Sequence, residues 1–452
     1  MTERTVIIAG GGASGLLLAH ALVRAGAAAT VVEPRAGLGA GVAYSTPFPC
    51  HVLNVPAAGM SALAGRPDHF VAWLAAAGHD ADPAAFVPRS LYGAYLAALA
   101  DEARALGGPR FRHVRARAVD AEPSDDGVRA TCDDGTTIDG DAFVVAVGNA
   151  NPSPWPNVCD AVRTSPRFFD SAWSEGAFDG AATDAVVLLG TGLTAVDAVL
   201  GLRHRGHRGP IVMVSRRGLL PHEHRLFDRP PALSLDATTI ADVIAAGRDA
   251  RRSPESDWRL AVDALRSETN ARWAALGVDA QRRFVRHVMP FWNVHRHRMA
   301  PQAAKTIAQL LADGTLRMIA GRTGALALSD AGIEVPVQLR GGGDRVTIAA
   351  QRVVNCSGPE HDITKRTNPL LRRLVERGSL VPHPLLIGSR VASDGALIDA
   401  AGIPSTRFYA IGPVRFGTLI ETTAIPEIRQ QVHDLAGVLL GDTSRSVREA
   451  GR

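Results

Sequence analysis

The sequence predicts an α/β protein built from two modules of the same plan. Residues 5–33 give a short β-branched strand, glycines, a helix with apolar residues at helical spacing and a second strand. Residues 184–214 repeat this order. Alternating strands with Gly and Asp turns follow at 112–149 and 316–359. Residues 221–313 are helical in pattern and too long for a loop, which indicates a helical insertion. We therefore expect two Rossmann-like domains.

The composition excludes several function classes. The chain has 452 residues, of which 46% are hydrophobic and 21% charged, as in ordinary globular proteins. Its net charge of +4 gives no reason to expect nucleic acid as a partner. No apolar run approaches the roughly 18 residues of a membrane span, and no apolar leader precedes the first strand. We therefore expect a cytoplasmic protein without a membrane partner.

The cysteines exclude one kind of redox chemistry. None is spaced as CxxC, so neither a dithiol redox pair nor a zinc ribbon is expected. No other metal site is expected either, because the pair His295-x-His297 would not share a face of a helix. The cysteines are Cys50, Cys132, Cys159 and Cys356.

The first glycine turn, Gly10-x-Gly12-x-x-Gly15, follows a strand and opens a helix. Gly10 permits the tight turn, Gly12 lets the backbone approach a pyrophosphate, and Gly15 lets helix and strand pack closely. The helix begins at Ala13 and Ser14, where free N–H groups and the positive end of the helix attract phosphates. These features predict an adenine-dinucleotide site; the alternative is a glycine-rich turn without a ligand.

An acidic residue completes this pattern. Glu33 ends the second strand, where a carboxylate accepts hydrogen bonds from ribose hydroxyls, and Pro34 follows it. A later apolar strand closes at Gly148, which we also assign to the first site.

The second glycine turn, Gly190-x-Gly192-x-x-Ala195, has the same context, and Ala is permitted at its third position. The turn and the helix start supply further candidate contacts: Thr191, Leu193 and Thr194. Here the second strand ends in Ser215, Arg216 and Arg217 instead of an acid.

The two strand ends distinguish the two nucleotides. A carboxylate would repel a 2′-phosphate, whereas arginine attracts it and can bind it through two hydrogen bonds. We therefore expect FAD at the first site and NADPH, in preference to NADH, at the second. The alternative is that Arg216 and Arg217 are a solvated strand end in an arginine-rich protein.

Several stretches, spread over nearly the whole chain, resemble a known class. The sequence resembles the two-dinucleotide-binding-domain flavoproteins, and among them the bacterial FAD/NAD(P)-binding branch that includes a flavin-dependent urate hydroxylase and an aspartate N-monooxygenase. The stretches are GVAYSTPFPCHVLNVPA (41–57), FVPRSLYGAYL (86–96), GTGLTAVD (190–197), VSRRGLLPH (214–222), FWNVHRHRMAP (291–301) and FYAIGPVRFGTLIETTAIPEIRQQ (408–431).

The resemblance implies that the NADPH domain is inserted into the FAD domain. We expect the FAD domain at 1–165 and 350–452 and the NADPH domain at 166–349, including the helical insertion at about 221–313. A strand would return to the flavin at Gly412. Many two-domain flavoproteins have Asp at the next position, which is Pro413 here. The flavin tail is then left to backbone groups or to Arg415 and Thr418.

Candidate catalytic and substrate residues follow from two further stretches. His51 and Asn54 lie among apolar residues that could keep a flavin pocket dry, so they are candidates for contacts with flavin or substrate. The alternative is a loop with a satisfied histidine. Arg296 and Arg298 belong to a segment dense in Arg and His, which suits an anionic substrate. The alternative there is a solvated face of an amphipathic helix.

These expectations lead to three functional hypotheses. The first is an NADPH- and FAD-dependent monooxygenase that uses molecular oxygen to hydroxylate a small, polar, nitrogen-containing and anionic substrate, urate-like or an amino acid. The second is an NAD(P)H oxidase or reductase without oxygen insertion. The third is a flavin-binding redox sensor with little turnover. The sequence does not predict an oligomeric state.

Overall fold

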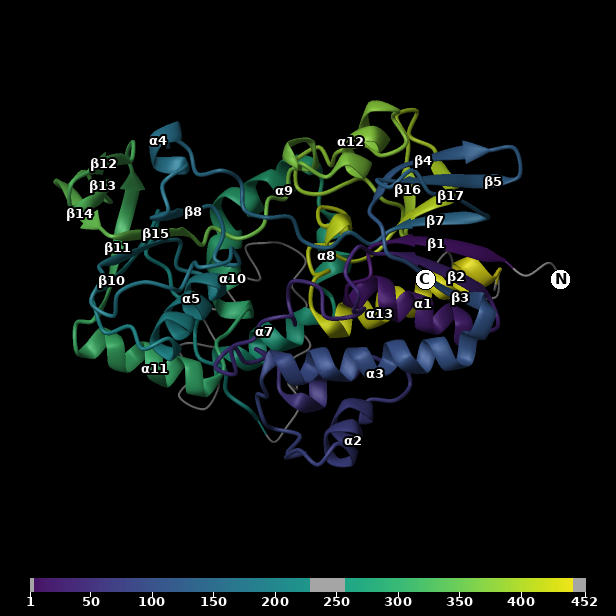
Figure 1. Cartoon of the computed structure of the whole chain (residues 1–452), viewed down its shortest axis with the longest axis horizontal. Coiled ribbons are helices and arrows are strands. Elements are labelled where there is room, and N and C mark those ends of the chain that lie inside the picture. Colours follow the sequence, from purple (N-terminus) through teal and green to yellow (C-terminus); the bar gives the residue numbers. More distant parts are fainter. Residues whose placement is uncertain (1–3, 228–256, 442–452) are drawn as a thin grey trace. The chain divides into compact units, whose positions relative to one another are not determined.

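The computed structural model describes residues 4–227 and 257–441, and the chain forms two compact units (Figure 1). Unit 1 consists of Met1–Pro47, Val55–Ala150 and Glu360–Arg452, and unit 2 consists of Phe48–Asn54 and Asn151–Pro359. In sequence, unit 2 lies within unit 1. The predicted α/β architecture, with one Rossmann-like domain inserted into another, is therefore confirmed.

The unit boundaries at 150/151 and 359/360 differ from the expected boundaries at 165/166 and 349/350. Strand pairing is the reason. Strand β8 (Phe168–Phe169) pairs with β15 (Arg352–Asn355), and β15 pairs with β9 (Val186–Leu189) in the sheet of unit 2. The segment before β8 belongs there too, because Val158 forms a bridge with Leu326.

Unit 1 is organised around a six-stranded sheet in the order β16-β17-β7-β1-β2-β3. Its strands pair in parallel except for β16, which is antiparallel to β17. A three-stranded antiparallel sheet β4-β5-β6 lies between β3 and β7 in sequence. The strands are β1 (Thr5–Ala9), β2 (Ala28–Val32), β3 (Phe111–Val114), β4 (Ala118–Ser124), β5 (Gly127–Cys132), β6 (Thr137–Gly140), β7 (Ala142–Val145), β16 (Ala396–Ile398) and β17 (Pro404–Ala410).

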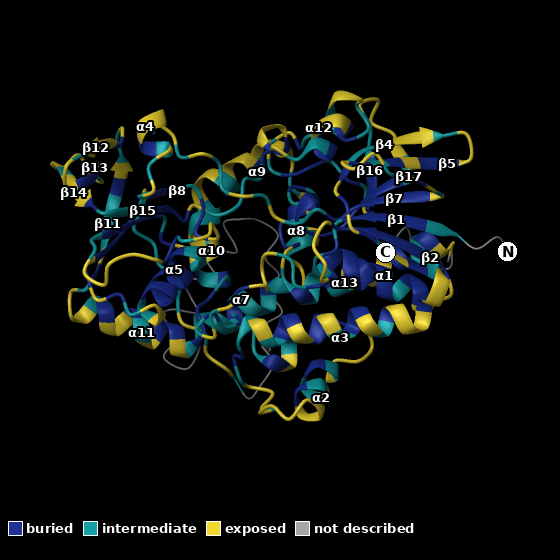
Figure 2. Ribbon diagram, viewed as in Figure 1, coloured by how far each residue is buried: buried dark blue, intermediate teal, exposed yellow. Residues whose placement is uncertain are grey.

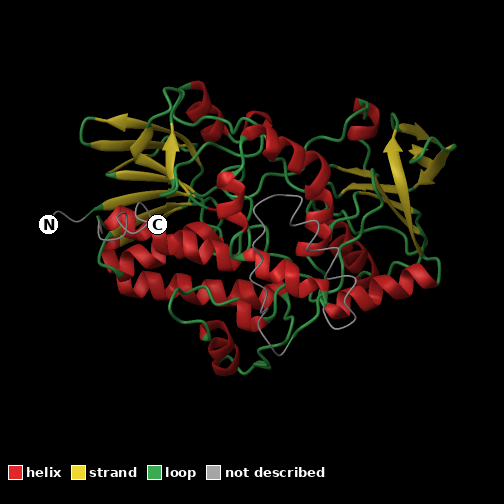
Figure 3. Ribbon diagram, turned by 180° about the vertical axis from the view of Figure 1, so that it is seen from behind, coloured by secondary structure: helices red, strands yellow, loops and turns green. Residues whose placement is uncertain are grey.

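Helices α1, α3 and α13 lie side by side along one face of this sheet (Figures 1 and 3). Helix α12 packs against β4 of the smaller sheet. The helical elements of unit 1 are α1 (Ala13–Arg24), η1 (Ala57–Gly59), α2 (His69–Ala76), α3 (Arg89–Gly107), η2 (Gly108–Arg110), η4 (Ile363–Lys365), α12 (Pro369–Glu376), η5 (Gly412–Arg415) and α13 (Ile425–Leu440).

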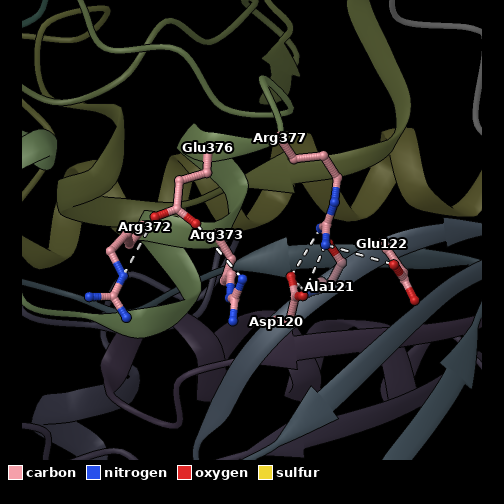
Figure 4. Close-up of polar contacts among 7 residues, drawn as sticks. All are labelled: Asp120, Ala121, Glu122, Arg372, Arg373, Glu376 and Arg377. Atoms are coloured by element: carbon pink, nitrogen blue, oxygen red, sulfur yellow. Dashed lines mark hydrogen bonds and ion pairs between the residues drawn. The ribbon is translucent and has the colours of Figure 1, made fainter.

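An ion pair fastens the returning segment of unit 1 to the small sheet. Arg377, which follows α12, donates to both carboxylate oxygens of Asp120 at 3.0 and 2.9 Å and to the carbonyl oxygen of Ala121 at 2.6 Å (Figure 4). Glu122 lies 3.7 Å from the same guanidinium. These contacts join residues more than 250 positions apart, so they fix the chain that leads back into the main sheet.

Unit 2 contains an eight-stranded sheet in the order β12-β13-β11-β10-β9-β15-β8, with β14 paired to β13. Its remaining strands are β10 (Ile211–Ser215), β11 (Leu316–Thr323), β12 (Ala327–Ser329), β13 (Gly332–Leu339) and β14 (Arg345–Ala350). Its helical elements are α4 (Asp160–Arg163), α5 (Leu193–His204), α7 (Trp258–Arg266), α8 (Thr269–Ala275), α9 (Val278–Arg283), η3 (Phe284–Val288), α10 (Met289–Arg296) and α11 (Pro301–Ala312).

In the expected helical insertion, residues 257–313 are mainly helical, whereas residues 221–227 form no helix. Residues 228–256 of it lie outside the described residues. Element η3 is a π-helical turn between α9 and α10. Pro290, at the start of α10, has no N–H to donate, which removes one α-helical hydrogen bond next to this turn.

The central strands of each unit are buried (Figure 2). In β1, β7 and β9 nearly all side chains are apolar and excluded from solvent, as expected for parallel strands covered on both faces. Among the described residues, no helix combines the length and hydropathy that a bilayer crossing requires.

Candidate functional site

The first glycine turn is shaped by two positions that exclude a side chain. Gly10 has φ +112°, and a Cβ atom there would lie 2.4 Å from the carbonyl oxygen of Ala146. A Cβ atom on Gly15 would lie 1.9 Å from the carbonyl oxygen of Gly10. Both positions therefore hold the start of α1 against β1 and β7, as the sequence predicts.

Gly12 is different, because its surroundings are open. It precedes α1, and the nearest atom to a Cβ there would be the Cα atom of Gly41, at 3.7 Å. Gly39 forms a β-bridge with Gly12, and its N–H donates to the carbonyl oxygen of Gly11 at 2.7 Å. The amides at the start of α1, which include those of Ala13 and Ser14, face this glycine-lined opening without intrahelical acceptors. This space fits a pyrophosphate.

Sequence reasoning missed three of these glycines. Gly39 and Gly41 line the opening, and Gly11 approaches Glu33 closely, because a Cβ on Gly11 would lie 2.7 Å from the Glu33 Cβ atom. The signal was present as the run GLGAG at 37–41, but its proximity to Gly12 depends on the fold.

Glu33 is buried, with 4% of its surface exposed. Its carboxylate accepts hydrogen bonds from the Gly11 N–H at 2.9 Å and from Arg35 Nε at 2.8 Å. Burial alone would raise the pKa of Glu33, but the hydrogen bonds from Arg35 and Gly11 outweigh it and lower the pKa. The carboxylate is therefore ionised and fixed beside the turn, where a ribose could donate to it. Pro34, which follows it, is exposed.

The carboxyl ends of three adjacent strands, β1, β7 and β17, meet at one edge of the sheet of unit 1. In open α/β sheets, ligands bind at this edge. Gly10, Gly148 and Gly412 follow these strands in that order. Gly148 has φ +70° and nothing within 4 Å of a Cβ position, so it leaves space at the edge. A Cβ on Gly412 would lie 2.6 Å from Ser14 Oγ.

The turn at Gly412 and Pro413 is held by hydrogen bonds from α13 and from the loop before it. The Gly412 N–H donates to Gln431 Oε1 at 2.9 Å, and Thr422 Oγ1 donates to the carbonyl oxygen of Gly412 at 2.9 Å. Gln431 Nε2 in turn donates to Thr422 Oγ1 at 3.0 Å. Pro413 is buried. Gln431 and Thr422 were not predicted, because nothing in the sequence pairs them with Gly412.

Thr418 and Arg415 already have partners within unit 1. Thr418 Oγ1 accepts from the Val391 N–H at 3.1 Å and donates to the carbonyl oxygen of Ser389 at 3.2 Å. Arg415 is buried and donates to the carbonyl oxygen of Ser393 at 3.0 Å. Burial lowers the pKa of Arg415 to about 10. These contacts favour a structural role for Thr418, whereas the buried Arg415 also has an Nε atom without a hydrogen-bond partner among the described residues.

The second glycine turn repeats the geometry of the first. Gly190 has φ +138°, and a Cβ there would lie 2.4 Å from the carbonyl oxygen of Cys356. Gly192 precedes α5 and has nothing within 4 Å of a Cβ position. Ala195 is fully buried. The opening in front of Gly192, with the free amides of Leu193 and Thr194 at the helix start, fits a second pyrophosphate.

Ser215 organises the strand end that carries the arginines. Its Oγ accepts from Thr191 Oγ1 at 3.0 Å and from the Gly218 N–H at 3.0 Å. Arg216 is exposed, whereas Arg217 Nη2 donates to the carbonyl oxygen of Arg286 at 3.2 Å. The structure thus separates two arginines that the sequence treated alike: the Arg216 side chain is exposed, whereas Arg217 is engaged with Arg286.

His51 and Asn54 both belong to unit 2. His51 has no exposed surface, and its Nε2 lies 2.9 Å from the carbonyl oxygen of Asp197 in α5. Its ring packs edge-on against Trp173 and Phe178, at 6.0 and 6.2 Å between ring centroids. This burial favours a packing role for His51 over contact with flavin or substrate. Asn54 is half-buried.

Arg296 and Arg298 are also buried, with 8% and 2% of their surfaces exposed. Arg298 forms an ion pair with Asp263, and its guanidinium lies 5.8 Å from the ring centroid of Trp258. Burial, followed by the charge of Arg298, lowers the pKa of His224 to about 4. The ion pair with Asp263 ties Arg298 to α7, whereas its Nε and Nη1 atoms are buried without hydrogen-bond partners in the described part of the chain.

Comparisons with known proteins agree with this geometry. Residues 7–150 match the FAD-NAD(P)-binding family model. No curated protein sequence matches the chain significantly.

Three solved structures match the chain almost from end to end. Ornithine hydroxylase from Pseudomonas aeruginosa is 16% identical over 97% of this chain and 99% of that chain, with a TM-score of 0.67. Ornithine N-hydroxylase from Kutzneria sp. 744, with reduced FAD, NADP+ and L-ornithine, is 14% identical over 98% and 100%, with a TM-score of 0.67. L-Lysine 6-monooxygenase from Pseudomonas syringae is 14% identical over 98% and 100%, with a TM-score of 0.68. Disulfide reductases share the fold as well.

At these identities the solved structures establish the fold. Together with the family match and the two glycine turns, they confirm the predicted resemblance to the two-dinucleotide-binding-domain flavoproteins. Residues 7–150 carry the FAD-NAD(P)-binding signature, and the chain has the fold of the two-dinucleotide-binding-domain flavoproteins.

Proposed function

We propose that the protein is an NADPH- and FAD-dependent monooxygenase that hydroxylates an amine nitrogen of a small amino-acid-type substrate. In the balanced reaction, the amine, oxygen, NADPH and a proton give the hydroxylamine, NADP+ and water. One oxygen atom enters the new N–O bond, and the other leaves as water. NADPH supplies the two electrons, and FAD, when bound, supplies the oxygen chemistry.

The contrast between the residues that follow β2 and β10 supports this proposal most directly. The first turn has a buried, ionised carboxylate at Glu33, which suits a ribose with free hydroxyls. The second has the exposed Arg216, which suits a 2′-phosphate. A chain with one site of each kind is equipped to hold FAD and to exchange NADPH.

The amino-acid class of substrate is supported by the structural matches, because the ornithine and lysine enzymes act on amines of amino acids. No described residue singles out one amino acid. A urate-like substrate is therefore a less favoured form of the same proposal.

The chain's own residues would bind and position the cofactors and would not themselves react. The amides of Gly12, Ala13 and Ser14 would bind the FAD pyrophosphate, and those of Gly192, Leu193 and Thr194 would bind that of NADPH. The Gln431–Thr422 pair would hold the turn at Gly412 rigid beside the flavin. Asn54 remains a candidate for a polar contact.

A second candidate function is an NADPH oxidase without oxygen insertion. The ion pair of Arg298 with Asp263 favours it, because the Asp263 carboxylate already offsets the charge of one of the two cations proposed to bind a substrate. In that case NADPH, a proton and oxygen would give NADP+ and hydrogen peroxide.

The test is a product assay with the FAD-loaded protein, NADPH and isotope-labelled oxygen gas. We would screen L-ornithine, L-lysine, L-aspartate and urate, and measure label in the product by mass spectrometry. The proposal predicts one labelled oxygen in a hydroxylated amine and NADPH consumption that depends on the substrate. The Gly12→Ala variant, which is expected to bind FAD poorly, is the matched control. Peroxide in place of labelled product for every substrate tested would support the oxidase.

A further inference from the structure

Unit 1 contains a groove whose lining includes none of the residues proposed to bind a cofactor. It has a volume of about 470 Å³, within the range of about 300–1,000 Å³ typical of small-molecule sites. Its walls are one face of α1, one face of α13 and the loop at 62–66. The α1 and α13 residues that line it recur every three or four positions, as expected for a single helix face.

The groove runs along α1 and α13 from the fifth residue of each helix, Leu17 and Arg429, to the C-terminal ends. Helix α1 begins at the first glycine turn, and the groove is lined by residues from Leu17 to Arg24 on it and by Ala25, which follows it. At 1.5 Å per residue, Arg24 lies about 18 Å along the helix from Gly12. On α13 the lining runs from Arg429 to Leu440, the last residue of the helix.

The floor of the groove is apolar and partly empty. Ala21, Ala62 and Ala436 contribute small side chains to it. A Cβ atom on Gly437 would have no atom within 4 Å, so this position faces open space. A narrow apolar body, such as an alkyl chain, fits a floor of this kind.

The rim is cationic. Arg24, Arg66 and Arg429 line the groove, and none of the described residues that line it is acidic. Glu102, outside the lining, lies 3.6 Å from Arg24. The two helix C-termini add partial negative charge of about half an elementary charge each. Three arginines exceed these negative charges, so the rim has a net positive charge.

The loop wall is fixed in place. Ser61 Oγ donates to the carbonyl oxygen of Arg66 at 2.5 Å, and the Ala62 N–H donates to Tyr95 Oη at 3.3 Å. Arg429 Nη1 donates to the carbonyl oxygen of Ser61 at 2.8 Å. These bonds join the loop to α3 and α13, so the groove is preformed.

We propose that this groove is a second ligand site that binds an amphipathic anion, with an alkyl body along the floor between α1 and α13 and a carboxylate or phosphate head at the arginines. The occupant's charge follows from the rim and its apolar body from the floor. The proposal does not depend on the reaction proposed above.

The test is isothermal titration calorimetry of the FAD-loaded protein with decanoate and with decyl phosphate, which share the body and differ in the head group. Decyltrimethylammonium, with the opposite charge, and inorganic phosphate, without the body, are the comparison ligands. We expect saturable one-to-one binding of decanoate, of decyl phosphate or of both. We expect no saturable binding of either comparison ligand. The tighter of the two anions identifies the head group.

Two variants locate the binding. Gly437→Leu fills the floor, and it also replaces a glycine in a helix interior, which removes a destabilising residue. We expect it to abolish binding without lowering the melting temperature. Arg66→Glu reverses a rim charge and should weaken binding at least tenfold. Arg112→Glu, at an exposed position of β3 outside the groove, makes the same change in net charge and should have no effect.

Several outcomes would overturn the proposal. These are the absence of saturable binding, equal binding of decyltrimethylammonium, or binding that neither groove variant weakens. Binding that appears only after removal of residues 442–452 would assign the groove to the chain's own C-terminus instead.

Discussion

The carbonyl oxygen of Gly10 lies 1.9 Å from the point that a Cβ atom on Gly15 would occupy. Gly10 and Gly15 thus leave no room for a side chain, whereas Gly12, between them in the same turn, leaves room for one. This difference separates a glycine required by the fold from a glycine required by a ligand.

We predict that Gly12→Ala weakens FAD binding at least tenfold without lowering the melting temperature of the FAD-free protein. A methyl group at position 12 meets no protein atom within 3.5 Å, and the backbone there is extended, but the methyl would occupy the space of a pyrophosphate. Titration of the FAD-free protein, followed by flavin fluorescence, measures the affinity. Gly15→Ala is the contrast, since overpacking should cost about 1–3 kcal/mol of stability. Unchanged FAD affinity in Gly12→Ala would place the pyrophosphate elsewhere.

We predict that Arg216→Gln raises the KM for NADPH about tenfold or more and leaves the KM for NADH nearly unchanged. A charge-assisted hydrogen bond to the 2′-phosphate is worth about 1.5–3 kcal/mol. Arg217→Gln is the matched control and should have a smaller effect, because Arg217 already donates to the carbonyl oxygen of Arg286. Steady-state kinetics with both nucleotides decides between them. Equal effects of Arg216→Gln on NADPH and NADH would contradict the assignment.

We predict that Arg377→Gln destabilises unit 1 by about 1–2 kcal/mol at pH 7. The change removes two hydrogen bonds to Asp120, and both side chains are about two-thirds or more buried. Arg372→Gln, which breaks only the 3.8 Å pair of an exposed Arg372 with Glu376, is the control and should cost less than about 0.5 kcal/mol (Figure 4). Denaturant unfolding followed by circular dichroism measures both.

The same pair gives a pH dependence of defined sign. Burial would raise the pKa of Asp120, but the hydrogen bonds from Arg377 and the Ala121 amide outweigh it and lower the pKa. The pair therefore stabilises the protein fully above the unfolded-state pKa of about 4. This contribution is lost as the pH falls through the lower folded-state pKa. The stability difference between wild type and Arg377→Gln should shrink on acidification, and a constant difference would contradict the pairing.

We predict that His361 is neutral in the folded protein at pH 5.5. Its ring stacks on Phe416 with centroids 4.4 Å apart, and burial, followed by the charge of Arg366, lowers its pKa to about 4. Between pH 6.5 and 4 the unfolded chain binds a proton that the folded chain does not. Stability therefore falls by up to about 3 kcal/mol across this range. His361→Phe keeps the stack and should remove this component. An NMR titration of the ring with a midpoint near 6.5 would refute the prediction.

Local signals in the sequence predicted the two turns well. Gly15 is required by local contacts with Gly10 and Ile8, whereas Gly10 and Gly190 approach Ala146 and Cys356 at the ends of neighbouring parallel strands, an approach that is typical of turns of this type. The order of strands and helices followed from periodicity.

Contacts between segments that are distant in the chain could not be predicted from the sequence. The bonds from Gln431 and Thr422 to Gly412, and the approach of Gly39 to Gly12, depend on how the strands order themselves in the sheet. The ion pair of Arg298 with Asp263 depends on how α7 packs against α10. A residue's type and spacing do not show whether its charge is already neutralised, which is why the substrate residues were the least predictable part.

The product of NADPH oxidation tests the central claim most directly. With FAD-loaded protein, NADPH and an amino-acid substrate that stimulates NADPH consumption, we would measure hydroxylamine and hydrogen peroxide in the same sample. The account predicts about one hydroxylamine for each NADPH consumed and little peroxide. Peroxide equal to the NADPH consumed, with no hydroxylamine for any amino acid tested, would contradict it.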